Sequence, residues 1–578
     1  MLSFDHHVLL WLLTLPLISA IVVWCLGPNR GPAIRGISFV SSLIVMALAA
    51  ILVVRYLSLE RKALEVLPRS GIATFVPEFV PGSTEDLPHA TTWNLLPVGK
   101  DGHIQFFLGV DGLNLWLIAL TALLMLPSVL VSFRQVTERV NEFYAWLLAL
   151  QTCMLGVFLS FDIVLFYVFF EVSLIPLFFL IGIWGGSQRQ YAARKFFIYT
   201  LAGSLITLLG VLGVVIACYT HTGKFTFAIP ELVRDVHLQL ASDQPEVRAT
   251  WNAVQMWTFL AMALGFAIKV PLLPFHTWLP LAHVEAPTAG SVDLAGVLLK
   301  IGSYGFLRLC IPLAPDFTYS HGLPLVTWLA AIGVVYGAFC AYAQDDVKRL
   351  IAYSSVSHLG LCMLGMFSLT AVGIQGSLMQ MINHGLSTAA LFLLIGMLYE
   401  RYHTRQMRDY SGMATRMPLF GVCLVFACLS SVGLPLLNGF IGEFLCLAGI
   451  YQFECLPRPG ESGPTPRVLP ILTFLGALGL VMGAWYLMTM LRKVLFGPLK
   501  EPPHEGHAIE DLTPREWGLL TPIFILCVVI GFYPHPILKS AEPDVDRIAL
   551  VVEKARERAK QAEKRLPPGP ARADARQP

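Results

Sequence analysis

The sequence predicts an all-α membrane protein with about fourteen transmembrane helices, arranged as two inverted five-helix repeats that each contain a broken helix. The chain of 578 residues is 56% hydrophobic and only 13% charged, and its mean hydropathy is +0.66. It contains many apolar runs that are long enough to cross a bilayer, and proline interrupts two of them. The composition excludes a cytosolic enzyme, a disordered chain and a disulfide scaffold, and it weighs against an outer-membrane barrel.

The apolar runs are recognised by their length, because a membrane-spanning helix needs about 20 residues. The first run has no basic segment before it and no small-residue cleavage site, so we expect a retained span and not a cleaved signal peptide. Two loops, 55–111 and 219–254, are long, and the second carries a short amphipathic pattern. The runs centre on residues 8–26, 36–54, 112–132, 143–160, 162–183, 195–218, 255–277, 288–311, 324–343, 350–369, 371–399, 417–450, 469–495 and 516–537.

Lysine and arginine in the loops predict the orientation of the chain. With the N-terminus outside, the inside loops hold more of these residues than the outside loops, as the positive-inside rule requires. An even number of spans then places the C-terminus outside as well, although the basic tail from Ala541 departs from the rule. We therefore expect a multi-pass protein of the cell (inner) membrane with both termini on the outer, periplasmic side. The tail at Val545–Arg565 has helical spacing, so it either packs on a surface or a partner subunit, or frays.

Two proline breaks near mid-membrane indicate a transport site. The first lies at Pro271 and Pro274, and the second lies at Pro435, 164 residues beyond Pro271. A proline lacks the backbone N–H and collides with the preceding turn, so each helix should kink or unwind. Irregular backbone at this depth persists only against protein or water, and paired broken helices in two halves mark transport sites. Two unrelated proline kinks are the alternative interpretation.

These features divide the chain into four parts. We expect N-terminal spans and a long outside loop over 1–111, and a first transport half over 112–311. A second transport half would follow over 312–500, and a last span with a polar basic tail over 501–578.

Glu171 and Lys269 are ionisable residues inside spans of the first half. Each such residue costs a few kcal/mol at mid-bilayer by insertion scales, so a bundle retains it when it has a partner or a role. Lys269 lies two residues before Pro271 and is the natural partner of Glu171. Separation of the pair would let the lysine release its proton, which would make a switch. A static ion pair that fastens two helices is the alternative.

Lys300, Asp293 and Tyr304 share one face of an otherwise apolar span, because their spacing is helical. His358 and His384 lie on successive spans of the second half. A neutral imidazole accepts a proton on one nitrogen and gives one from the other, so we expect a relay that continues from Lys300. The alternatives for the histidines are satisfied polar residues of the core and axial haem ligands.

Glu443 follows the second break inside an apolar run and would end this chain of titratable groups; a surface carboxylate at a helix end is the alternative. The eleven cysteines include no C-x-x-C pair, so we expect neither an iron–sulfur cluster nor a structural zinc site. No G-x-G-x-x-G follows a strand, and no P-loop is present. The sequence therefore predicts that this chain binds no nicotinamide, flavin or metal.

Five stretches together resemble the antiporter-like subunits of respiratory complex I, the proton-pumping NADH–quinone oxidoreductase. Within that family the pattern is similar to the subunit M branch, the counterpart of mitochondrial NADH dehydrogenase subunit 4. Glu443 stands where the other branches typically have lysine, and the spans end near the fourteenth. The stretches are LFYVFFEVSLIPLFFLIGIWG, KVPLLPFHTWLPLAHVEAPTAGSVDLAGVLLKIGSYGFLR, DDVKRLIAYSSVSHLG, MINHGLSTAALFLLIGMLYER and GLPLLNGFIGEF.

The resemblance implies a translocase subunit that moves protons while other subunits oxidise NADH and reduce quinone. It implies no cofactor in this chain, although the complex as a whole uses NADH, flavin, iron–sulfur clusters and quinone. The partners would be other membrane-arm subunits, including the neighbouring antiporter-like subunits, the lipid bilayer and protons, with no nucleic acid. Carried over residue by residue, it assigns proton translocation to Glu171, Lys269, Lys300, His358, His384 and Glu443.

Three other functions remain open on the sequence. A stand-alone Mrp-type cation/proton antiporter, or the membrane subunit of a related hydrogenase, shares the glutamate–lysine motif. A structural subunit that only anchors others would have no reason to bear the desolvation cost of a row of buried charges. A haem-binding cytochrome would reveal itself by its absorption spectrum.

Overall fold

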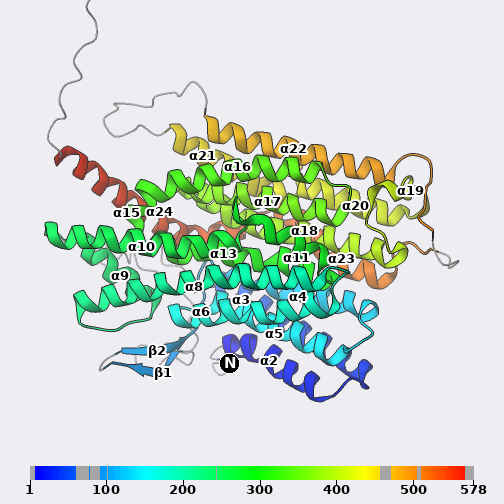
Figure 1. Ribbon diagram of the computed structural model, residues 1–578, viewed down its shortest axis with the longest axis horizontal. Coiled ribbons are helices and arrows are strands. Elements are labelled where there is room, and N and C mark those ends of the chain that lie inside the picture. Colours follow the sequence, from blue (N-terminus) through cyan, green and yellow to red (C-terminus); the bar gives the residue numbers. More distant parts are fainter. Residues whose placement is uncertain are drawn as a thin grey trace, which may run out of the picture.

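The computed structural model shows an elongated bundle of helices (Figure 1). Among the residues that it describes, twelve helices are long and apolar enough to cross a membrane. The predicted helical membrane fold is confirmed, with the addition of one small hairpin. The described residues are 7–59, 77, 92–99, 102–242, 244–455, 470–503 and 509–565.

The elements follow one another with short connections. Up to the first break they are α2 (Val8–Cys25), α3 (Gly31–Leu57), β1 (Thr92–Val98), β2 (Gly102–Phe107), α4 (Leu115–Gln135), α5 (Val140–Leu159), α6 (Ile163–Val172), α7 (Leu174–Trp184), α8 (Arg189–Thr222), α9 (Ile229–Leu240) and α10 (Pro245–Lys269). Then come η1 (Phe275–Thr277), α11 (Trp278–Glu285), α12 (Thr288–Asp293), η2 (Leu294–Leu298), α13 (Leu299–Gly305), η3 (Phe306–Cys310), α14 (Ile311–Leu313), α15 (Pro315–Phe317), η4 (Thr318–Gly322) and α16 (Leu323–Tyr342). The rest are α17 (Val347–Met366), α18 (Ala371–Tyr402), η5 (Met407–Asp409), α19 (Met413–Arg416), α20 (Pro418–Ser431), α21 (Asn438–Cys455), α22 (Ile471–Leu495), α23 (Pro514–Phe532) and α24 (His535–Arg565).

The count of fourteen spans stays a prediction. Each predicted run coincides with helix in the structure, but two runs do not yield one long apolar helix. The tenth run is α17, which carries the polar side chains Lys348, Arg349 and His358 and is therefore less apolar than its neighbours. The twelfth run is divided between α20 and α21 by the second break.

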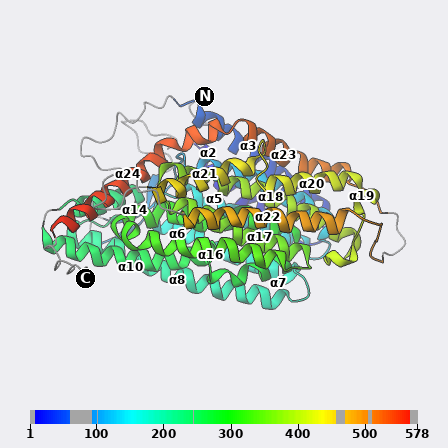
Figure 2. The same cartoon turned by 90° about the horizontal axis from the view of Figure 1, so that it is seen from above.

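The helices run side by side along the longest axis of the molecule, as two perpendicular views show (Figure 1, Figure 2). Helix α9, the β1–β2 hairpin and part of α24 lie at one end of the bundle, and α19 lies at the opposite end. We call these the α24 end and the α19 end. The loops predicted to lie inside the cell, such as those at Arg134, Lys348 and Arg405, lie at the α19 end around one cavity.

The first predicted break is confirmed. Helix α10 ends at Lys269, and the chain resumes as helix only at η1 and α11. The indole Nε1–H of Trp278 donates to the carbonyl of Ile268 at 2.9 Å. The N–H of Leu272 donates to the carbonyl of Ala267 at 2.9 Å. These bonds satisfy carbonyl groups that the end of a helix leaves without an intrahelical donor, so an irregular segment can persist in the core.

The second predicted break is confirmed as well. Helix α20 ends at Ser431, and α21 begins at Asn438. The side-chain amide of Asn438 donates to the carbonyl of Asn383 at 3.2 Å, and the amide of Asn383 donates to the carbonyl of Asn438 at 2.6 Å. Ser430 Oγ donates to Asn438 Oδ1 at 2.6 Å. This reciprocal pair fixes the break against α18.

The structure contains interruptions that the sequence did not predict. Helices α6 and α7 meet at Ser173, two residues after Glu171. The span that carries Lys300 contains two π-helical segments, η2 before the lysine and η3 after it. A π-helical segment widens the helix by one residue and often occurs at functional sites.

The tail helix predicted around Val545–Arg565 is confirmed as part of α24. Its apolar residues Val545, Ile548 and Val552 are buried against the rest of the chain. The helix therefore packs on its own chain over the described residues and does not fray. The long loop 55–111 contains the antiparallel hairpin β1–β2, and much of that loop lies outside the described residues. The amphipathic pattern predicted in loop 219–254 forms α9.

Candidate functional site

Lys269 and Glu171 lie in the first half, where two interruptions approach each other. Lys269 is the last residue of α10 and is only 2% exposed. Its Nζ lies 5.0 Å from the centroid of the Phe170 ring and has no hydrogen-bond partner. Glu171 lies beside the α6–α7 interruption, and its Oε2 is also buried without a partner. The structure records no ion pair between these two described side chains, so the expected direct pairing of Glu171 with Lys269 is not formed here.

The broken end of α10 packs tightly on the helix that carries Lys300. A Cβ atom at Gly302 would lie 2.7 Å from Val270 Cγ2 and 3.0 Å from Lys269 Cβ. A larger residue at this contact would displace the Val270 side chain and press on Lys269 Cβ. The sequence therefore places the two lysines of the first half on helices in direct contact.

Lys300 is fully buried and makes the central contact of the site. Its Nζ lies 2.8 Å from Nδ1 of His384, which belongs to α18. The same ammonium donates to the carbonyl of Ala295, which lies in the π-helical segment η2. The predicted link between Lys300 and the histidines is thus a direct contact in the structure.

The two histidines and Glu443 extend this series of ionisable groups into the second half. We call Lys300, His384, His358 and Glu443 the row. The ring centroids of His358 and His384 are 5.7 Å apart. Nδ1 of His358 lies 3.3 Å from Oε1 of Glu443, and Nε2 of His358 lies 3.5 Å from the hydroxyl of Tyr486. Glu443 is 4% exposed, so it is no surface carboxylate in this chain.

The backbone of the second break makes room for Glu443. Gly433 has φ of 75°, and a Cβ atom there would lie 2.0 Å from Oε2 of Glu443. Both the left-handed conformation and the close approach require glycine at this position. The break therefore shapes the place that the carboxylate occupies.

Sequence reasoning missed two groups that lie close to this row. Arg308 forms a fully buried ion pair with Asp111 at 2.6 Å, eight residues after Lys300 on the same span. The helical spacing from Lys300 would have revealed Arg308, whereas nothing in the sequence pairs it with Asp111. His283 of α11 is also fully buried; it stacks on Phe392 at 4.9 Å, and neither ring nitrogen has a hydrogen-bond partner.

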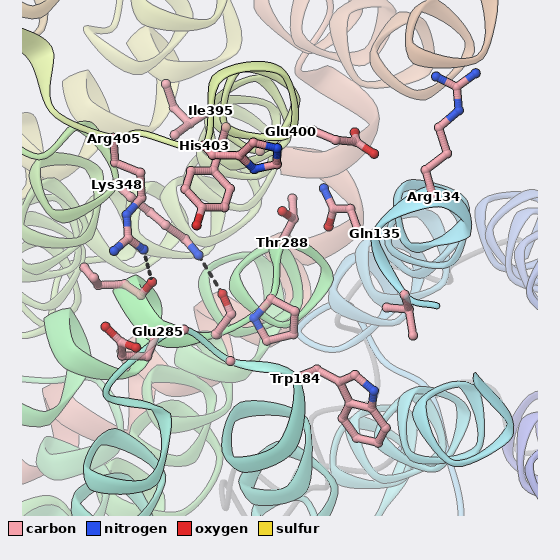
Figure 3. Close-up of a pocket in the computed structure, with 18 residues that line it drawn as sticks. Arg134, Gln135, Trp184, Glu285, Thr288, Lys348, Ile395, Glu400, His403 and Arg405 are labelled. Carbon is pink, nitrogen blue, oxygen red and sulfur yellow. Dashed lines mark hydrogen bonds between the residues drawn. The ribbon is translucent and has the colours of Figure 1, made fainter. Parts of the chain in front are cut away.

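A cavity of about 400 Å³ opens at the α19 end. Figure 3 shows that Lys348 and Arg405 converge there with Glu285. Lys348 Nζ donates to the carbonyl of Ala286 at 2.6 Å, and Arg405 donates to the carbonyl of Val284 at 2.6 Å. The cavity therefore adjoins the segment between α11 and α12, which connects the first break to the Lys300 span. Its lining includes the charged side chains of Lys348, Arg405 and Glu285.

The six predicted residues thus fall into two groups. Lys300, His384, His358 and Glu443 form one series of neighbours, and Lys269 and Glu171 lie beside its start without a mutual contact. Amine, imidazole and carboxylate groups in series can pass protons, and no partner with a fixed positive charge neutralises Glu443 within hydrogen-bond distance in the described chain. Among the described residues, no group of three or more His, Cys, Asp or Glu could hold a metal ion.

Comparison with known proteins gives consistent matches. A family model described as NADH:quinone oxidoreductase/Mrp antiporter, TM, matches residues 160–456. The chain is 40% identical over 441 residues to NADH-quinone oxidoreductase subunit M of Pseudomonas aeruginosa, covering 75% of this chain and 80% of that protein.

Two solved structures are similar over nearly the whole chain. A chain of respiratory complex I from Thermus thermophilus with bound NADH aligns with a TM-score of 0.74 and 30% identity, covering 94% of this chain and 99% of that chain. A chain of the Mrp complex from Dietzia sp. DQ12-45-1b aligns with a TM-score of 0.73 and 17% identity, covering 96% and 99%. The second similarity shows the shared fold alone.

Proposed function

Because this chain belongs to the NADH-quinone oxidoreductase subunit M family, we propose that its row of buried ionisable groups translocates protons as part of that enzyme. The observation that carries the proposal is the series of neighbours from Lys300 through His384 and His358 to Glu443. A membrane protein retains such a row against its desolvation cost when the groups have a role. The chain is a proton-translocating membrane subunit, and its partners are other membrane-arm subunits, including neighbouring antiporter-like subunits.

The proton path that we propose begins at the α19 end and uses both halves. A proton taken up there charges Lys269, next to the first break, and passes to Lys300 on the adjoining helix. Lys300 gives it to Nδ1 of His384, which it already contacts at 2.8 Å. His358 then receives it and passes it to Glu443, from which it leaves at the opposite face.

Lys269 and Glu171 form no direct ion pair among the described residues, which favours a switch over a static connection between the helices. A static ion pair would hold the two side chains in contact, whereas Lys269 Nζ has no hydrogen-bond partner and Glu171 bonds Ser204. We propose that the two groups pair and separate during turnover, and that the interrupted helices α6–α7 and α10–α11 permit this movement. The pairing would hold the proton on Lys269, and the separation would release it.

The energy for this transfer must come from the rest of the enzyme. Moving one proton against roughly 150 mV costs about 3.5 kcal/mol. We propose that this chain itself holds no nicotinamide, flavin, iron–sulfur cluster or quinone, and that it is classed as a translocase through the complex. Redox energy would then arrive as an electrostatic push from a neighbouring subunit.

The proposed location is the inner membrane with the α19 end toward the cytoplasm. Lys348, Arg405 and Arg134 gather around the cavity at that end, as the positive-inside rule favours. Both termini would then lie on the periplasmic side, with α24. The proposed transport halves, 112–311 and 312–500, each contain one of the two proline breaks.

Lys269→Ala in the assembled enzyme tests the proposed function. NADH-driven quinone reduction and proton pumping should fall together, by about tenfold or more, because loss of a proton-transfer group costs at least that in rate. Both are measured in native membrane vesicles, with gel analysis of the intact complex as the control for assembly. Unchanged redox turnover together with loss of a sodium/proton exchange would contradict the proposal and favour an Mrp-type antiporter, whose fold this chain shares.

A further inference from the structure

We propose that the buried Asp111–Arg308 ion pair is a barrier that closes the direct way from Lys300 to the α24 end, and so directs the proton sideways to His384. The inference rests on the proposed function, because it concerns where the proton on Lys300 can go. Lys300 lies in the middle of its span, so a second way out for its proton runs along its own helix to the α24 end. A pump that used His384 and Glu443 as its exit would short-circuit if that route were open.

Three residues line that route on one helical face. Lys300, Tyr304 and Arg308 are spaced by four residues, so they lie one above another. The rise of the helix separates Lys300 from Arg308 by about 12 Å. All three are fully buried. A proton that left Lys300 toward the α24 end would therefore meet Tyr304 and then Arg308.

The hydrogen bonds from Tyr304 toward the α24 end lead to a group that cannot accept a proton. The Tyr304 hydroxyl donates to the carbonyl of Phe158 at 3.3 Å and accepts from Nε of Arg308 at 3.0 Å. A guanidinium has five N–H donors and no acceptor, so it cannot receive a proton from the tyrosine. Its fixed positive charge also repels a proton that approaches from the lysine.

Asp111 holds the guanidinium in this position. The ion pair has contacts of 2.6 Å and 2.8 Å, and both side chains are 0% exposed. The aromatic ring of Phe161 lies 4.8 Å from the guanidinium carbon. Asp111 also accepts the backbone N–H groups of Leu113 and Asn114 at the start of α4. Tyr304 contacts the guanidinium at Nε, whereas Asp111 contacts it at Nη1 and Nη2, so the hydrogen bonds from the Tyr304 hydroxyl lead to the positive partner.

Helix α24 covers this pair from the outer end. The N–H of Gly112 donates to Oδ2 of Asp544 at 2.7 Å, and Asp544 pairs with Arg547 at 2.7 Å. A Cβ at Gly112 would lie 2.1 Å from the carbonyl oxygen of Ser540. Trp116 Nε1–H donates to Ser540 Oγ at 2.7 Å. Close packing of α24 thus keeps water away from the turn that carries Asp111.

The test measures passive proton leak through the purified complex in liposomes without NADH, after a pH jump. The double variant R308Q/D111N replaces the ion pair by a neutral hydrogen-bonded pair and leaves no unpaired charge. We expect it to raise the leak by about tenfold, as a barrier lower by about 1.4 kcal/mol would. The control R558Q/D316N neutralises the ion pair between α24 and α15. This pair does not lie on the Lys300 face, so the control should not leak.

The outcomes separate this inference from the proposed function. A tight R308Q/D111N complex would overturn the barrier. Should R308Q/D111N fail to assemble, R308Q/D111S supplies the same neutral test with a smaller side chain at the turn. Because no NADH is present, a failed leak prediction leaves the pumping result of Lys269→Ala untouched. A leak in R308Q/D111N with normal redox turnover would support the barrier whichever residues carry the proton onward.

Discussion

Glu443 and Glu454 lie on the same helix, α21, and are both 4% exposed, yet their surroundings differ. Glu454 accepts the N–H groups of Leu472 and Thr473 and the hydroxyl of Thr473, so it caps the start of α22. Glu443 contacts His358, itself a titratable group. Burial alone therefore does not identify a proton carrier, and the chemical nature of the neighbour does.

This contrast provides a matched pair of variants. Glu443→Gln keeps the shape of the side chain and removes its ability to take up a proton, so coupled quinone reduction and pumping should fall by about tenfold or more. Glu454→Gln changes an equally buried carboxylate on the same helix and should leave the pumped protons per electron unchanged. For both variants, the rates of quinone reduction and proton pumping, and the number of protons pumped per electron, are measured in vesicles during NADH oxidation. Equal effects of the two substitutions would show that Glu443 acts only through stability.

Single residues show what the sequence could predict about the site. Lys300 and the two histidines were recognisable because a charge inside a span is costly, and the contact of Lys300 with His384 agrees with the expected relay. The direct ion pair expected between Glu171 and Lys269 is not formed between these two described side chains. The distance between two helices depends on packing, which the sequence pattern of a single helix does not contain. Asp111 was missed for a related reason, since it lies in a loop before α4 and its ion pair with Arg308 depends on tertiary packing.

At the level of elements, both mid-membrane breaks were predicted from proline, whereas the interruption between α6 and α7 was missed. Proline has a fixed backbone effect that can be read locally. Pro176 of α7 lies four residues after Val172, the last residue of α6, so it cannot bond the Val172 carbonyl and the same local effect applies there. The π-helical segment η2 presents the Ala295 carbonyl to Lys300.

Gly433 lies in the second break and leaves the space that the Glu443 carboxylate occupies. Gly433→Ala should lower the thermal stability of the complex, because a left-handed backbone costs about 1–2 kcal/mol with a Cβ atom. The new methyl group would also displace the Glu443 carboxylate, so turnover should fall at temperatures where the complex is still intact. Thermal inactivation and initial quinone reduction rates measure the two effects separately.

The control for this prediction is Gly213→Ala in α8. A Cβ atom at Gly213 meets nothing within 4 Å, and alanine is the better helix former. This variant should match the wild type in both measurements. If Gly433→Ala also matched the wild type, the shape of the second break would have no part in placing Glu443.

At the scale of the whole molecule, the row joins two halves that each contain a broken helix. Its crossing point is the contact between Lys300 in the first half and His384 of α18 in the second. The helix α24 packs against elements of both halves and covers the outer end of the Lys300 span. The helical content and the positions of the spans followed from hydropathy, but this arrangement required the fold, because hydropathy carries no information on which helices are neighbours.

His384→Met tests the central claim most directly. Methionine fills a similar space and cannot carry a proton, so it interrupts the row where Lys300 contacts α18 of the second half. His237→Gln on α9 is the control, because that buried histidine only bonds the Pro312 carbonyl and lies off the row. The account predicts that His384→Met lowers redox turnover and proton pumping together, by about tenfold or more, in a fully assembled complex. Full turnover with an unchanged number of protons pumped per electron would contradict it.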